Sequence, residues 1–468
     1  MKSDIHFGTD GWRAKIAEGF TFEKVGKVSQ ALAAVLPARS SVLVGFDTRF
    51  ASDRFAKQVG QILIANKHKA ILADSIIPTP ALSLMVGLRQ AQAGVMITAS
   101  HNSGEYNGYK IKLPPGVSAP SSFTQLIEKH ILKAPVVLNP DQVCPTFSWK
   151  SEYLNILKKK VDLASIKNAG LKIVVDSMHG AGQRLLEELL SGGKTQVRTI
   201  AGQPDPLFGG RHPEPIAENL KPLCTEVKLW KAAVGFANDG DADRIGMVDE
   251  CGHYVDVHKI HALIFYHLKN HRKENGSIIK TVSGTMMIEK MAQAWNCPVV
   301  ETPVGFKYIG EQMMKNDVLL GMEESGGIAI KNHLPERDGL LSALLLTEAL
   351  SIFRKPVTVI LSQLQKQFGP YFSCRHDMAQ IPSELQLKII EHLKGNPPLR
   401  IAGTRILGTN TLDGLKFQMD NAWLLIRSSG TEPLLRIYAE ASSLKQVQKI
   451  LAETHRMILS LLRPQNRR

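Results

Sequence analysis

The sequence has 468 residues, of which 44% are hydrophobic and 21% are charged, a composition typical of globular proteins. This length exceeds what one hydrophobic core supports, and it predicts roughly three or four domains. No apolar run reaches the ~18 residues that a membrane span needs, and the first residues lack the pattern of a signal peptide. We therefore expect a cytoplasmic protein without membrane partners.

The formal net charge of +14 favours anionic ligands. Because no basic stripe interleaved with aromatic residues is present, we expect no nucleic-acid partner. The five cysteines lack metal-ligand spacing, and their odd number predicts free thiols. We expect each to be a buried structural residue: Cys144, Cys224, Cys251, Cys297 and Cys374.

Short apolar segments that run into a polar turn and then a helix-like stretch recur along the chain. They lie at residues 41–46, 171–175 and 276–281. Each predicts a buried strand followed by a helix, and their repetition predicts three similar α/β domains.

A serine follows the apolar run Gly94–Ile97, in the segment Ile97-Thr98-Ala99-Ser100-His101-Asn102. Catalytic side chains tend to lie where a buried strand ends, so Ser100 is a candidate nucleophile and phosphate carrier. The segment Asn107-Gly108-Tyr109-Lys110 follows closely.

Three aspartates alternate with small residues in Asp239-Gly240-Asp241-Ala242-Asp243-Arg244, between the strand-like runs 234–237 and 245–248. The alternate spacing places their carboxylates on one side of an extended turn, where they offer the hard oxygen ligands that Mg²⁺ prefers.

Two alternatives apply to the same loop. With Glu250, the aspartates match positions 1, 3, 5 and 12 of an EF-hand calcium loop, but Arg244 stands where that loop needs glycine and the flanks are strand-like rather than helical. An ordinary acidic surface turn is the other alternative. It is disfavoured because three aspartates repel one another unless cations hold them.

Two further loops carry groups that suit a sugar phosphate. Gly321 to Gly327 contains Glu323, Glu324 and Ser325, which offer acceptors for sugar hydroxyls. The string Arg427-Ser428-Ser429-Gly430-Thr431-Glu432-Pro433 joins strand-like runs at 423–426 and 434–438, and its donors suit a phosphate. With a helix-like stretch at 383–393, these runs predict a smaller α+β domain at the end of the chain.

Together and in this order, these four strings resemble the α-D-phosphohexomutase family, which includes phosphoglucomutases and phosphomannomutases. The resemblance covers nearly the whole chain, beginning at Phe7-Gly8-Thr9-Asp10-Gly11-Trp12-Arg13. It implies three similar α/β domains with mixed sheets and a smaller C-terminal α+β domain around a central cleft. We place the domains at residues 1–149, 150–251, 252–370 and 371–468.

The resemblance also implies a role for each matching residue. Ser100 is the phosphoserine and, with Asp239, Asp241 and Asp243, holds Mg²⁺. Lys110 is a general acid/base assisted by His101. Arg244 lies near the transferring phosphoryl group, and Arg13 supports the phosphoserine region. The implied substrate-binding residues are Lys307, Glu323, Ser325, His333, Arg427, Ser429, Gly430 and Thr431. A proton-shuttling lysine needs a lowered pKa, which we expect from crowding by Arg13, Arg244 and His101.

The implied reaction interconverts hexose 1-phosphate and hexose 6-phosphate. Phosphorylated Ser100 gives its phosphoryl group to the bound sugar, and the resulting hexose 1,6-bisphosphate turns end for end before it returns the other group. The bisphosphate also serves as activator, sugar phosphates are the ligands, and we expect a monomer or weak homodimer that acts in carbohydrate metabolism.

Departures from the family pattern bear on the sugar. Ala242 and the string Glu-Glu-Ser-Gly-Gly at 323–327 differ from what phosphoglucosamine mutases usually carry, which disfavours glucosamine phosphate. The same string is more typical of phosphoglucomutases than of phosphomannomutases. Glucose is therefore the predicted sugar, with mannose or dual specificity as the alternative. A catalytically silent sugar-phosphate sensor is the alternative from another class.

Overall fold

The computed structural model describes residues 5–131, 133, 135–428 and 434–462. The chain forms two compact units: Met1–Gly276 with Gly305–Ile360, and Ser277–Val304 with Leu361–Arg468. Among the described helices, none is long and apolar enough to cross a membrane.

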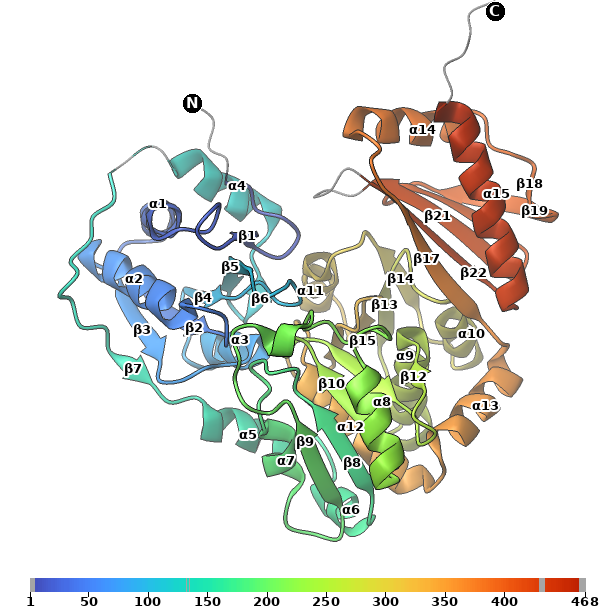
Figure 1. The fold of residues 1–468 in the computed structure, drawn as a ribbon, viewed down its shortest axis with the longest axis horizontal. Helices are drawn as coiled ribbons and strands as arrows, with labels where there is room; N and C mark the ends of the chain where they lie inside the picture. Colours follow the sequence, from blue (N-terminus) through green and yellow to red (C-terminus); the bar gives the residue numbers. More distant parts are fainter. Residues whose placement is uncertain (1–4, 132, 134, 429–433, 463–468) are drawn as a thin grey trace, which may run out of the picture. The chain divides into compact units, whose positions relative to one another are not determined.

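The first α/β domain is built on a seven-stranded mixed sheet in the order β1-β5-β4-β2-β3-β7, with β6 paired to β5 (Figure 1). β2 is parallel to β3 and β4, whereas β5 is antiparallel to β4 and β1. The strands are β1 (Trp12–Lys15), β2 (Ser41–Phe46), β3 (Lys69–Ala73), β4 (Ala93–Ile97), β5 (Tyr106–Leu113), β6 (Val117–Ser118) and β7 (Thr146–Phe147). The helices are α1 (Phe22–Val35), α2 (Ser52–Ala65), α3 (Thr79–Leu88) and α4 (Ser121–His130).

Strand β4 is buried on both faces because helices cover both sides of this sheet. Val95 and Ile97 join the core that α1 and α2 complete. On the opposite face, Gly94 lies against Leu82 and Val86 of α3, and an added Cβ would come within 2.5 Å of Val86. This packing fixes the end of β4, from which the Ser100 loop departs.

The second α/β domain has a five-stranded sheet in the order β12-β11-β10-β8-β9. β10 is parallel to β8 and antiparallel to β11. The three aspartates lie in the turn that joins β10 to β11. The strands are β8 (Lys172–Asp176), β9 (Gln196–Ile200), β10 (Val234–Asn238), β11 (Ile245–Val248) and β12 (Tyr254–Val255). The helices are α5 (Lys150–Lys158), α6 (Leu163–Asn168), α7 (Leu185–Leu190) and α8 (Lys221–Trp230), with a 3₁₀ turn at Phe208–Gly210.

The elements of the third α/β domain are divided between the two units. In the first unit, β15 (Val318–Met322) pairs antiparallel with β16 (Ile328–Ile330). In the second, β13 (Ser277–Thr281) pairs in parallel with β14 (Val299–Thr302). The helices are α9 (Val257–Tyr266), α10 (Met286–Ala294), α11 (Phe306–Lys315), α12 (Gly339–Phe353) and α13 (Val357–Phe368), with a π-helical turn at His267–His271.

The C-terminal domain is an antiparallel six-stranded sheet in the order β17-β22-β21-β20-β19-β18, with α14 and α15 packed against it (Figure 1). α15 buries Val447, Ile450, Thr454 and Ile458, the spacing of one helical face. Its elements are β17 (Phe372–Met378), α14 (Ser383–Gly395), β18 (Arg400–Ile401), β19 (Thr404–Asn410), β20 (Leu415–Met419), β21 (Ala422–Ser428), β22 (Leu435–Ala441) and α15 (Leu444–Leu462). The expected architecture of three α/β domains and a smaller C-terminal domain is confirmed.

The cysteines are free thiols, as expected, but the prediction that each is buried is wrong. Cys251 is exposed and the other four are partly exposed. Cys251 lies in the hairpin turn between β11 and β12, where a side chain has no core to enter.

Candidate active site

The loop after β4 brings Ser100 to the first aspartate of the loop after β10. Ser100 is fully buried, and its Oγ donates a hydrogen bond of 2.7 Å to Asp239 Oδ2. Its backbone lies in the left-handed region at φ +53°, and its N–H donates to Thr98 Oγ1 over 2.9 Å. Residues 139 positions apart are thus joined at the ends of two buried strands.

The three aspartates form one buried cluster whose ligand atoms lie within 4.8 Å of one another. Asp239 Oδ1 accepts the backbone N–H groups of Asp243 and Arg244, each at 3.1 Å, and these bonds curl the loop. Burial and the carboxylates of Asp243 and Asp241 raise the pKa of Asp239 well above its usual range.

This cluster fits a divalent cation. Within the described residues, the Oδ1 atoms of Asp241 and Asp243 are buried without a hydrogen-bond partner. Free carboxylate oxygens beside a third carboxylate and a serine hydroxyl form a donor set of the kind Mg²⁺ uses.

The EF-hand alternative does not match the structure. The loop is flanked by strands β10 and β11 rather than helices. Glu250, the twelfth position, accepts a hydrogen bond from the Thr358 hydroxyl. It is not part of the described cluster of Asp239, Asp241 and Asp243.

Lys110 of β5 lies against the aspartates. Its Nζ is 2.8 Å from Asp241 Oδ2, 3.3 Å from Asp243 Oδ2 and 2.7 Å from Asp10 Oδ2. Burial alone would lower the pKa of Lys110, but these three carboxylates outweigh it and raise the pKa above its usual value. The expectation of a lowered pKa is therefore wrong for this arrangement, because it considered neighbouring cations and left out the carboxylates.

His101, Arg13 and Arg244 surround the serine loop. Burial, followed by the positive charges of Arg244 and Arg13, lowers the pKa of His101 well below its usual range, so the imidazole is neutral at pH 7. Arg13 Nη1 donates to Asn102 Oδ1 over 2.9 Å. Arg244 Nε lies 3.8 Å from Asp239 Oδ2 and 3.9 Å from Asp243 Oδ1.

The loop that carries Glu323 and Ser325 sits directly on the aspartate loop. Ser325 Oγ donates to Glu323 Oε2 over 2.9 Å, and Ile245 N donates to Gly326 O over 3.1 Å. Arg244 and Gly327 form a β-bridge. Burial and the adjacent Glu324 raise the pKa of the Glu323 carboxyl.

Arg337 and Asp10 are among the site residues that sequence reasoning missed. Arg337 Nη2 lies 2.6 Å from Asp10 Oδ2 and 2.8 Å from Asp243 Oδ2, and its Nη1 lies 3.6 Å from Glu323 Oε2. It thereby joins the aspartate loop to the predicted sugar loop. Asp10 lies inside the motif 7–13 and could have been found there, since a carboxylate beside the matched Arg13 needs a cationic partner. The charged string before α12 was the only signal for Arg337.

The described contacts of Lys307 and His333 do not involve the three aspartates of the metal cluster. Lys307 Nζ donates to Ser121 Oγ over 2.7 Å. His333 Nε2 lies 2.8 Å from Asp338 Oδ2, and Asp338 also accepts the Tyr153 hydroxyl and caps α12. Their substrate-binding roles stay predictions.

Of the predicted phosphate clamp, the structure describes Arg427, which lies in the second unit. Arg427, on β21, has its Nε 3.2 Å from Asp413 Oδ2. Ser429, Gly430 and Thr431 lie outside the described residues.

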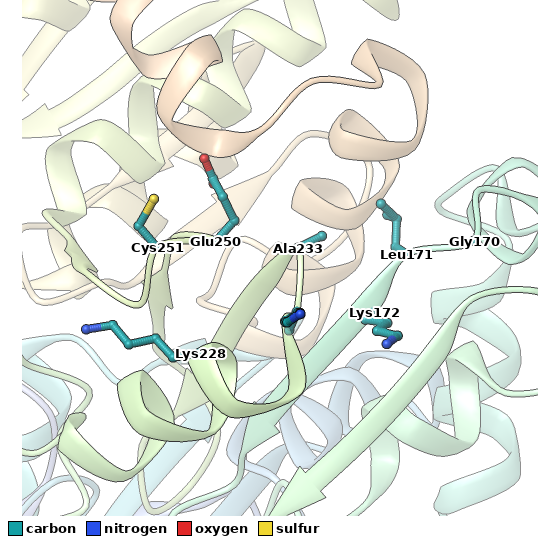
Figure 2. Close-up of a pocket in the computed structure, with 9 residues that line it drawn as sticks. Gly170, Leu171, Lys172, Lys228, Ala233, Glu250 and Cys251 are labelled. Atoms are coloured by element: carbon teal, nitrogen blue, oxygen red, sulfur yellow. The ribbon is translucent and has the colours of Figure 1, made fainter.

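A separate open hollow of about 570 Å³ is not lined by Ser100, by Lys110 or by the three clustered aspartates (Figure 2). It is lined by Gly170, Leu171, Lys172, Lys228, Lys231, Ala232, Ala233, Glu250 and Cys251. Next to it, ligand atoms of Asp249, Cys251 and His253 lie within 4.8 Å of one another, but Cys251 and His253 are exposed and Asp249 Oδ1 already accepts both of their backbone N–H groups. Neither the hollow nor this group of three residues combines a buried serine hydroxyl with buried carboxylates, as the Ser100 cluster does.

Family models for the phosphoglucomutase/phosphomannomutase domains match most of the chain. The α/β/α domain I model matches residues 4–136, the domain II model 151–252, the domain III model 256–368 and the C-terminal domain model 385–456.

Individual proteins are similar over nearly their whole length. A phosphoglucomutase/phosphomannomutase of Thermococcus kodakarensis is 29% identical over 95% of this chain and 96% of its own. A probable phosphoglucosamine mutase of Methanosphaera stadtmanae is 31% identical over 96% and 97%. A crystal structure from Thermus thermophilus, provisionally named a phosphomannomutase, superposes with a TM-score of 0.87 at 32% identity, covering 98% of this chain and 100% of its own.

Proposed function

Because the chain belongs to the phosphoglucomutase/phosphomannomutase family, we propose that it is a phosphohexomutase that interconverts glucose 1-phosphate and glucose 6-phosphate through phosphorylated Ser100. One observation carries the proposal: the hydroxyl of a strained, buried serine lies 2.7 Å from an aspartate of a buried three-carboxylate cluster. A nucleophile beside a cation site is the arrangement that phosphoryl transfer needs.

Asp239, Asp241, Asp243 and Ser100 would hold Mg²⁺. When bound, the ion would supply positive charge to the oxygens of the phosphoryl group. Buried Arg244 and half-buried Arg13 add fixed positive charge beside the Ser100 loop, and their partial removal from water strengthens this effect.

In the first transfer, a sugar hydroxyl oxygen attacks phosphorus and the bond from phosphorus to Ser100 Oγ breaks. The attacking hydroxyl loses its proton, and Ser100 regains one. Lys110 is the proposed acid/base, because its Nζ lies 2.8 Å from Asp241 Oδ2, in the same cluster that the Ser100 hydroxyl contacts. His101, neutral at pH 7, assists as acceptor. Lys110 can act as a base only when some of its carboxylate partners are otherwise engaged, since their charge is what raises its pKa.

After this transfer, the hexose 1,6-bisphosphate turns end for end, and the reverse chemistry returns the other phosphoryl group to Ser100. We propose that Arg427, Ser429, Gly430 and Thr431 hold the phosphate that is not being transferred, and that free hexose 1,6-bisphosphate reloads Ser100.

The sugar is proposed from the loop 323–327. Its Glu-Glu-Ser string favours glucose, with mannose as the alternative. A specific observation also favours glucosamine phosphate, since the 31% identical relative from Methanosphaera stadtmanae is a probable phosphoglucosamine mutase.

The deciding experiment is kcat/KM for the 1-phosphates of glucose, mannose and glucosamine side by side, with Mg²⁺ and a trace of the matching 1,6-bisphosphate. A preference for glucose of about 10-fold or more, worth about 1.4 kcal/mol of transition-state binding, supports the proposal. A preference for glucosamine phosphate replaces the sugar and keeps the mutase. Activity on none of the three favours a silent sugar-phosphate sensor.

A further inference from the structure

The serine loop rests on a buried arginine that the mechanism above does not use. Arg49 follows β2, and its side chain is completely buried. Its guanidinium has five N–H donors, and every one has an acceptor. Nε donates to Asp47 Oδ2 at 3.0 Å, Nη1 to Ser103 O at 2.6 Å and Tyr106 O at 2.9 Å, and Nη2 to Ser100 O and Asn102 O at 2.7 Å each.

Four of these five bonds hold the backbone of one short segment, residues 100–106. That segment includes the left-handed Ser100, a conformation that is unfavourable for a non-glycine residue unless its surroundings fix it. Charge-assisted bonds to the Ser100 and Asn102 carbonyls supply that fixation, because each is stronger than a neutral hydrogen bond.

The arginine is itself held in place. Asp47 Oδ1 accepts the Arg49 backbone N–H at 3.0 Å and the Ser52 hydroxyl at 2.9 Å. The ring of Phe208 covers the guanidinium, with its centroid 4.7 Å from Arg49 Cζ. The guanidinium of Arg49 is therefore held fixed against the carbonyl oxygens of the serine loop, while the Ser100 hydroxyl points to Asp239.

We propose that Arg49 is a positioning residue for phosphoryl transfer. This inference rests on the proposed function. Arg49 holds the Ser100 backbone so that Oγ stays beside Asp239. Its bonds to the serine loop go to backbone carbonyls rather than to the Ser100 hydroxyl. Since a misplacement of ~1 Å can cost about 10²-fold in rate, loss of these bonds lowers turnover more than substrate binding.

The test variant is Arg49→Lys, because lysine keeps the charge but offers three donors without the planar fork. We expect kcat to fall about 10²-fold while KM changes less than about 3-fold. The matched control is Arg272→Lys, at an arginine that also joins a carboxylate, Glu348, to a backbone carbonyl, that of Lys160. Its kcat should stay within about 2-fold of the wild type.

A second readout follows the phosphoserine. After loading with glucose 1,6-bisphosphate, intact-mass spectrometry measures how long Ser100 keeps its phosphate in buffer without acceptor sugar. We expect a shorter lifetime in Arg49→Lys, because a loosened loop exposes the phosphate to water, and an unchanged lifetime in Arg272→Lys.

Each outcome decides something. A folded Arg49→Lys enzyme with wild-type kcat, or with only KM raised, overturns the positioning role. Wild-type enzyme without mutase activity on any of the three sugars overturns the proposed function and this inference with it. If Arg49→Lys does not fold, Phe208→Leu decides: we expect about a 10-fold loss of kcat from the uncovered guanidinium, and wild-type kcat in that variant overturns the role.

Discussion

At the residue scale, the first prediction concerns the nucleophile. Ser100→Ala should abolish turnover while sugar-phosphate binding is largely kept, because the change removes one hydroxyl at a buried position and leaves the surrounding charges in place. Steady-state assays measure the first effect and calorimetric titration with glucose 1-phosphate the second. Near-full mutase activity in this variant would end the phosphoserine assignment.

The cation site gives the second prediction. Asp241→Asn should lower kcat by orders of magnitude, because it removes one carboxylate of the cluster and one partner of Lys110. The control is Glu250→Gln. This change would be equally damaging if the loop bound calcium as an EF-hand does, but here the Glu250 side chain contacts Thr358. Unchanged rates after treatment with a chelator would contradict the metal assignment.

The residues that sequence reasoning found and missed differ in a physical way. Ser100 and the three aspartates lie in local strings whose spacing already expresses their chemistry. Arg337 reaches Asp10 across 327 positions, and only the folded path of the chain creates that contact. The pKa of Lys110 was mispredicted for the same reason, since two of its three carboxylate partners lie more than a hundred residues away.

At the element scale, the third prediction tests the seating of the sugar loop on the aspartate loop. Gly326 has φ +89°, and an added Cβ would come within 2.6 Å of Ile245 O. Gly326→Ala should therefore push the two loops apart and lower kcat/KM at least about 10-fold. Steady-state kinetics on the preferred sugar phosphate measure this.

Gly170→Ala is the matched control. Gly170 also has positive φ, at +67°, but nothing lies within 4 Å of its added Cβ. The control thus reproduces the backbone strain, costing on the order of 1 kcal/mol of stability, without the collision. Equal kinetics in the two variants would show that the contact with Ile245 does not matter.

Strands were predictable where burial makes them continuous apolar runs. The predicted strand 41–46 has the same bounds as β2, and 94–97 lacks only the first residue of β4. β19 (Thr404–Asn410) has no continuous apolar run, because it belongs to an antiparallel sheet and none of its residues is buried. Such a strand is defined by its pairing with β20 rather than by its own composition.

At the scale of the whole molecule, the four-domain architecture followed from the repeated strands and the family resemblance. The exact boundaries and the central cleft stay predictions. What no periodicity could reveal is that residues 277–304 form one unit with the C-terminal domain. Within that unit, Trp423, Leu425 and Tyr438 pack with Val282 and, at the edge, Met286 and Val304.

Glu301 links these two stretches of chain and gives the last prediction. Its Oε1 lies 3.3 Å from Lys280 Nζ and 2.7 Å from Lys416 Nζ, and its Oε2 accepts from Asn410 at 3.0 Å. Burial alone would raise the pKa of Glu301, but the charges of Lys280 and Lys416 outweigh it and lower the pKa below its ordinary value of 4.5. At pH 7, Glu301→Gln should cost about 1–2 kcal/mol, seen as a lower calorimetric midpoint.

The pH dependence follows from the sign of the shift. Because the folded pKa lies below the unfolded one, the stabilisation by Glu301 is fully present above the unfolded value and is lost as the pH falls through the folded value. The midpoints of Glu301→Gln and wild type should therefore converge as the pH is lowered from about 7 to below the ordinary value of 4.5. Glu391→Gln, at an exposed pair with Lys394 in the same unit, should stay within about 0.5 kcal/mol of wild type at pH 7. A gap between Glu301→Gln and wild type that stays constant with pH would mean that the substitution acts through packing and not through the charge of Glu301.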